Sequence, residues 1–122
     1  MFDDSRPIYR QIAEQIKQDI VSGTLHEEEQ VMSTNQYASF YRINPATAQK
    51  AFQELVDEGV LYKKRGIGMF VSPGAQASLL AVRRDRFFDE VVVPMIDEAR
   101  TIGMPIADVL ARIRLYCGED GG

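Results

Sequence analysis

Two stretches of this 122-residue chain gather side chains that can bond to nucleic-acid groups. In the first, Gln49 can form two hydrogen bonds with adenine, Lys50 can reach guanine or a phosphate, and Thr47 can contact a thymine methyl group. The second is the basic run at residues 63–65, and Gly66 after it lets a backbone come close to a ligand. The positive charge of that run suits neutralisation of phosphates. These residues predict recognition of double-stranded DNA.

Other chemistries have too few residues of the right kind. Zinc sites use several nitrogen or sulfur ligands, and the chain has one histidine, His26, and one cysteine, Cys117. Neither Cys117 nor Ser33 has a histidine at a plausible position to activate it, although a lysine or aspartate base stays open. The Gly-Ile-Gly at residues 66–68 is too short for a phosphate-binding loop and suits a tight turn. We therefore expect no enzyme activity, no cofactor and no metal.

Helix caps indicate the elements that would position the polar residues. Ser33 and Gln36 have the spacing of a capping box, and Asn44 followed by a proline suits the start of a second helix. Gly59 is placed to end that helix, and short β-prone runs at residues 60–62 and 69–71 flank a basic turn. The apolar residues expected to face the core from the second helix are Ala48, Ala51, Phe52, Leu55 and Val56.

This order of elements predicts a mainly α (α+β) fold, an N-terminal winged helix-turn-helix with a small β-hairpin wing. The chain before it should support it: residues 6–21 form a helix capped by Ser5 with Pro7 in its first turn, and residues 30–32 add a brief third strand. The candidate DNA-binding residues lie at the helix starts, on the polar face of the second helix and in the wing. They are Ser33, Asn35, Gln36, Asn44, Ala46, Thr47, Gln49, Lys50, Lys63, Lys64, Arg65 and Gly66.

The second half of the chain has a different pattern. A breaker cluster at residues 72–74 separates a DNA-binding domain, residues 1–74, from a helical dimerisation and effector region, residues 75–122. Pro94 should kink the long helix there near residues 90–93, while Gly103 ends it and Pro105 opens another. The broad apolar stripe of this two-helix tail is Leu80, Phe87, Phe88, Val91, Met95, Ile96, Ile102, Val109, Leu110 and Ile113.

This stripe predicts a homodimer, which would present two recognition helices to one palindromic site. Two alternatives are that the stripe packs back onto the winged domain of a monomer, or that a small-molecule effector binds between the helices. One cysteine, no signal-peptide core and no apolar run of about 20 residues together predict a cytoplasmic protein without a membrane partner.

Net charge is unfavourable for a DNA-binding protein. The chain carries a formal charge of −4, and neither half is basic overall. Acidic residues collect at residues 27–29 and 57–58, away from the basic run. An alternative hypothesis is therefore a winged-helix protein-interaction module that does not bind DNA. The basic groups at residues 50 and 63–65 favour DNA, since a purely apolar protein interface gives them no role.

The motifs together resemble the GntR family of bacterial transcription regulators. The resemblance rests on Pro-Ile-Tyr at residues 7–9, the second-helix run at residues 44–55, Glu-Gly at 58–59 and Arg-Gly-Ile-Gly-Met-Phe-Val at 65–71. The short tail and the Asn-Pro-x-Thr-x-Gln start of the second helix are similar to the YtrA subfamily. The resemblance implies a dimeric, operator-binding regulator, often of transport genes, and most simply a repressor.

The chain departs from the family pattern at three places. The family usually has Pro-Gly where this chain has Glu27 and Glu28, and Leu-Pro-Ser where it has Val-Met-Ser at residues 31–33. A family arginine early in the first helix of the motif, which supports DNA contact, is Asn35 here. The resemblance therefore implies a changed affinity or operator preference.

Overall fold

The structure is a computed structural model, and it describes residues 2–118 of the chain. Its internal contacts divide the chain into two compact units, Met1–Ala81 and Val82–Gly122.

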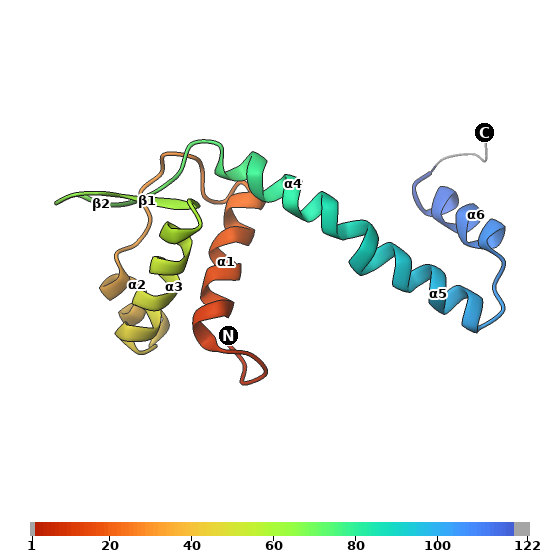
Figure 1. Cartoon of the computed structure of the whole chain (residues 1–122), viewed down its shortest axis with the longest axis horizontal. Helices are drawn as coiled ribbons and strands as arrows, with labels where there is room; N and C mark the ends of the chain where they lie inside the picture. The colour runs from red at the N-terminus through yellow and green to blue at the C-terminus, as the bar shows by residue number, and fades with distance from the viewer. Residues whose placement is uncertain (1, 119–122) are drawn as a thin grey trace. The chain divides into compact units, whose positions relative to one another are not determined.

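The first unit is a three-helix core that carries a β-hairpin. Its elements are α1 (Ile8–Ser22), α2 (Thr34–Tyr41), α3 (Pro45–Asp57), β1 (Leu61–Lys64) and β2 (Gly68–Val71). α1 and α3 lie side by side, and the hairpin follows the end of α3 (Figure 1). One apolar core holds α1, α3 and the hairpin together, and its most completely buried side chains are Phe52, Ile12, Ile20, Leu55, Leu61 and Val71. The predicted winged helix-turn-helix is confirmed.

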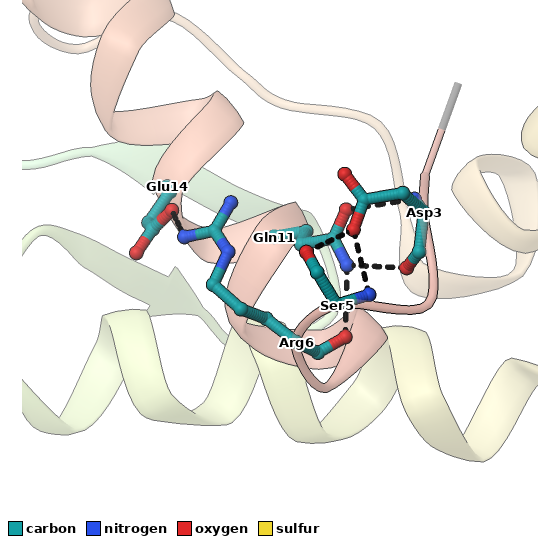
Figure 2. Close-up of polar contacts among 5 residues, drawn as sticks. All are labelled: Asp3, Ser5, Arg6, Gln11 and Glu14. Atoms are coloured by element: carbon teal, nitrogen blue, oxygen red, sulfur yellow. Dashed lines mark hydrogen bonds and ion pairs between the residues drawn. The ribbon is translucent and has the colours of Figure 1, made fainter.

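α1 starts later than predicted and without the predicted cap. Its N-cap is Pro7, which has no side-chain cap, while the hydroxyl of Ser5 donates to the carboxylate of Asp3. The prediction that Ser5 caps the helix is therefore wrong, because Ser5 lies two residues too early. Gln11 closes this turn instead: its side-chain nitrogen donates to the carbonyl oxygens of Asp3 at 2.7 Å and Arg6 at 2.8 Å (Figure 2).

The caps predicted for α2 and α3 are present. Ser33 Oγ accepts the backbone N–H of Gln36 at 3.1 Å, and Gln36 Oε1 accepts the backbone N–H of Ser33 at 3.0 Å. Asn44 Oδ1 accepts the backbone N–H of Ala46 at 2.8 Å. Gly59 follows α3 with φ of 79°, the left-handed conformation expected of a residue that ends a helix.

The hairpin strands are longer than predicted. Lys63 pairs with Met69 and Lys64 with Gly68, so both lysines belong to β1 and not to the turn, where they were expected. The turn between the strands is residues 65–67, closed by the N–H of Ile67 donating to the carbonyl of Lys64 at 2.9 Å. Neighbouring side chains of a strand point to opposite faces. The two lysines therefore differ in direction.

The third strand predicted at residues 30–32 is reduced to a single bridge between Gln30 and Phe70. In the loop before it, Glu28 has φ of 68°, which is unusual for a residue other than glycine. Glu28 stands where the family pattern has glycine, and two bonds hold it: its N–H donates to the carbonyl of Val71, and its carboxylate accepts the Tyr62 hydroxyl at 2.9 Å. That hydrogen bond to the carboxylate raises the pKa of Tyr62.

α4 (Ala75–Phe87) begins in the first unit, where Ala75 is buried. The second unit contains the π-helical segment η1 (Phe88–Val92), α5 (Val93–Thr101) and α6 (Ile106–Tyr116). A π turn lies where the kink was predicted, and in it the N–H of Val93 donates to the carbonyl of Phe88, five residues back. Pro94 follows directly and has no N–H to donate, so the wider turn accommodates it.

Apolar side chains of the second unit are mostly exposed in the single chain. Ala99 is buried, whereas the stripe residues Phe87, Phe88, Val91, Met95, Ile102, Leu110 and Ile113 are exposed, and Ile96 and Val109 are half-buried. The stripe residue that falls in the first unit, Leu80, is also half-buried. Within residues 2–118, no helix is both long enough and apolar enough to cross a bilayer.

Candidate nucleic-acid interface

A groove of about 790 Å³ lies between α3 and the hairpin. One wall of the groove is the face of α3 opposite the buried Ala48, Ala51 and Leu55. The other wall is formed by the hairpin, through the ends of both strands and the turn between them. Its lining residues are Thr34, Ala46, Gln49, Lys50, Phe52, Gln53, Lys63, Lys64, Arg65, Gly66, Ile67, Gly68 and Met69.

The groove brings together most of the residues predicted to bind DNA. Those that line it are Ala46, Gln49, Lys50, Lys63, Lys64, Arg65 and Gly66. The other five are Ser33, Asn35, Gln36, Asn44 and Thr47. The side chains of Ser33, Gln36 and Asn44 are engaged in the helix caps, Asn35 is exposed and Thr47 is half-buried.

Gln53 is a groove residue that the predicted site left out. Its Nε2 donates to Asp57 Oδ1 at 2.8 Å, and its Oε1 accepts Lys63 Nζ at 3.3 Å. Gln53 thus connects the last turns of α3 to the hairpin and directs Lys63 toward the helix. The signal was present in the sequence, since residues four apart share one face of a helix and Gln53 follows Gln49 by four.

The wing contributes further residues that the predicted site left out. Ile67, Gly68 and Met69 line the groove together with Thr34 of α2. Ile67 is exposed at the turn, and the side chain of Gln30 supports it from behind by donating to its carbonyl oxygen at 3.1 Å. Nothing in the residue types marked Thr34 or Met69, because their place in the groove depends on how the hairpin folds back beside α3.

Aromatic rings hold two of the groove's lysines. Lys64 Nζ lies 4.5 Å from the centroid of the Phe70 ring, on the face of the hairpin opposite to Lys63. Lys50 Nζ lies 4.0 Å from the centroid of the Tyr9 ring on α1. Lys64 also borders the groove, but its ammonium is drawn toward Phe70 and away from α3.

The positive groups around the groove have no carboxylate partner. Within the part of the chain that the structure describes, the ion pairs are Arg6–Glu14 and Lys17–Glu58, both away from the groove. The remaining cations of the first unit are Arg10, Arg42, Lys50, Lys63, Lys64 and Arg65. Within the first unit, the unpaired positive charge therefore lies on α3, on the hairpin and next to them, although the whole chain has a net charge of −4. Such an arrangement suits a polyanion better than the net charge implies.

A helix-turn-helix whose second helix is flanked by a basic β-hairpin defines a winged helix-turn-helix DNA-binding protein. Residues 8–71 match the family model described as bacterial regulatory proteins, gntR family. The chain belongs to the GntR family and is a DNA-binding transcriptional regulator, not an enzyme.

Known relatives share both the motif and the size of the chain. The HTH-type transcriptional repressor YtrA of Bacillus subtilis (strain 168) is 30% identical over 93 residues, covering 76% of this chain and 72% of YtrA. A transcriptional regulator from Oenococcus oeni has a similar structure, with a TM-score of 0.79, 27% identity and coverage of 93% of this chain and 95% of that one. This likeness supports the YtrA-like subfamily.

A third relative has been solved on DNA. The DNA-binding domain of AraR in complex with operator ORX1 has a TM-score of 0.55 and 27% identity. The match covers 59% of this chain and 93% of that one.

Proposed function

We propose that this regulator represses transcription by binding a palindromic operator as a homodimer. The observation that carries the proposal is the groove, where the exposed polar face of α3 and the basic hairpin meet with their positive charges unpaired. The B-DNA major groove is about 12 Å wide and admits an α-helix. In this proposal α3 enters it and Gln49 faces base edges, while Lys63 and Arg65 of the hairpin contact the phosphate backbone.

The proposal divides the chain by task. Residues 1–74 bind DNA, and residues 75–122 form the dimer through the exposed apolar stripe, which includes residues of α4, η1, α5 and α6. Exposed aromatic and aliphatic side chains such as Phe87, Phe88 and Ile102 support this assignment, since a contiguous apolar patch of this kind usually marks an interaction surface. A small-molecule effector would act on the same helices, by changing the spacing of the two α3 helices. Because the target is chromosomal DNA, we place the protein in the cytoplasm.

Selection from a random duplex library with the full-length chain tests the function and finds the operator. The expected result is an inverted repeat, bound with an affinity whose logarithm falls steeply with the logarithm of salt concentration, by about 0.9 per phosphate contact. The matched control is a scrambled duplex of the same length and base composition, which should bind more weakly but with a clear salt dependence.

Negligible affinity for both duplexes, with no dependence on salt concentration, would contradict this proposal. It would favour a winged-helix module that binds protein instead of DNA.

A further inference from the structure

The aromatic ring of Tyr9 lies close to two cations from different helices. The ring lies near the start of α1, is half-buried and packs against the core of the first unit. Lys50 Nζ of α3 lies 4.0 Å from its centroid, and Arg10 Cζ, from the next residue of α1, lies 5.5 Å from it. Both distances are within the range at which a ring attracts a cation, about 6 Å.

Carboxylates act on these cations only from a distance: the pKa of Arg10 is raised mainly by the Tyr9 side chain, and to a smaller extent by the charges of Glu54 and Glu14. Within residues 2–118, neither Arg10 nor Lys50 forms an ion pair with a carboxylate. Both charged groups lie within 5.5 Å of the same ring centroid. The distance between them is therefore no more than about one Debye length at 0.1 M salt, roughly 10 Å, so salt screens their repulsion only in part. The ring offsets part of this repulsion, and an anion bound by both groups would remove more of it. Because neither cation forms a direct ion pair within the described residues, both can bond an anionic ligand.

The place of these cations indicates which anion. Lys50 lines the groove next to Gln49, and Arg10 is exposed on α1 beside it. An ammonium above a ring uses only the side that faces the ring, so donors of Lys50 stay free to bond a phosphate oxygen. Its attachment to Tyr9, however, draws it toward α1 and away from the bases that Gln49 would meet.

Resting on the proposed DNA-binding function, we propose that Tyr9 is a positioning residue that holds Lys50 and Arg10 as a two-cation clamp for a DNA backbone phosphate beside the groove. Lys50 then fixes the register of α3 on the duplex, and base reading falls to its neighbour Gln49. This differs from the expectation from sequence, in which Lys50 could equally read guanine.

Three variants of the full-length chain test the clamp: Tyr9→Leu removes the ring, Tyr9→Phe keeps it as the matched control, and Lys50→Met removes the charge but keeps the stem. Affinity is measured on the selected operator and on a scrambled duplex at four salt concentrations. Lys50→Met should weaken both duplexes by similar factors and reduce the slope of log affinity against log salt by about 0.9. Tyr9→Leu should weaken both by about two- to five-fold and reduce the slope in the same direction, whereas Tyr9→Phe should match the wild type.

The double variant decides whether the ring acts through the lysine. Lys50→Met should cost less affinity in the Tyr9→Leu background than in the wild type. Equal costs in both backgrounds would overturn the proposal, and so would a Lys50→Met loss confined to the operator. A merely structural role for Tyr9 would lower the folded fraction in thermal unfolding but leave the salt slope unchanged.

Arg10→Met covers the case in which Tyr9→Leu does not fold, because Arg10 is exposed. It should reduce the salt slope on both duplexes, and an unchanged slope would contradict the clamp. If the wild type itself binds neither duplex, the proposed function fails. If the wild type binds with a clear salt dependence and these variants leave the slope unchanged, only the clamp fails.

Discussion

Gln49 has an exposed side chain on the groove face of α3, with no hydrogen-bond partner among the described side chains. A free amide can form two bonds with adenine in the major groove. Gln49→Ala should therefore relax operator preference and cost about 1–3 kcal/mol at one base pair. The measurement is binding to the operator and to a set of its single-base variants. Equal weakening on all of them would instead place Gln49 on the DNA backbone.

Lys63 and Lys64 are neighbours with opposite surroundings, which makes them a matched pair. Lys63 Nζ bonds to Gln53 on α3, whereas Lys64 Nζ lies over the Phe70 ring. Lys63→Met should reduce the slope of log affinity against log salt by about 0.9, and Lys64→Met should change it much less. Titration of both variants on one duplex is the measurement. A larger change for Lys64 would mean that the hairpin meets DNA by its other face.

Tyr37 is buried in the core, and burial raises the pKa of its hydroxyl because the charged form loses its water. The unfolded chain ionises a tyrosine near pH 10, while folded Tyr37 stays neutral to higher pH. Its contribution to the free energy of unfolding should be constant below about pH 10 and fall as pH rises above it. Tyr37→Phe should remove this part of the alkaline decline in chemical denaturation. The exposed Tyr116→Phe is the control, and an identical decline in both variants would contradict the prediction.

At the scale of the elements, the wing depends on Gly68. Gly68 has φ of 149°, a conformation that would be strained for any other residue type at this position. A Cβ added there would lie 2.6 Å from Gln30 Nε2, the atom that donates to the carbonyl of Ile67. Gly68→Ala should displace this support and cost about 1–3 kcal/mol of stability. Gly66→Asn is the control, because asparagine tolerates a φ near 77° and nothing lies within 4 Å of the added Cβ. Equal losses for the two variants in thermal unfolding would show that Gln30 plays no part.

The whole-molecule prediction concerns the dimer. Val91 lies in the apolar stripe and is 52% exposed, whereas Leu115 lies outside the predicted stripe and is 79% exposed. Val91→Asp should dissociate the dimer while the winged domain stays folded, and Leu115→Asp should not. Sedimentation at micromolar concentration, with circular dichroism as the folding check, is the measurement. A monomeric wild type would contradict the prediction, and it would favour packing of the stripe within one chain.

Local signals account for what the sequence determined by itself. The capping box at Ser33, the Asn44 cap and the glycine after α3 depend on residues at most three apart, so their spacing was enough to predict them. The core face of α3 followed from its helical period. The error at Ser5 was also local: its hydroxyl had a nearer acceptor in Asp3 than the helix it was expected to cap.

The tertiary structure decided which polar groups meet. Lys63 and Lys64 differ because strand pairing extends to Gly68 and brings both lysines into β1, which the residue types of the basic run did not indicate. Tyr9 reaches Lys50 only because α1 packs against α3, 41 positions along the chain. The composition gives only a total charge of −4, whereas the fold of the first unit places most of its unpaired cations around α3 and the wing. Spacing along the chain sets local geometry, whereas contacts between distant segments set the electrostatics of the DNA-binding surface.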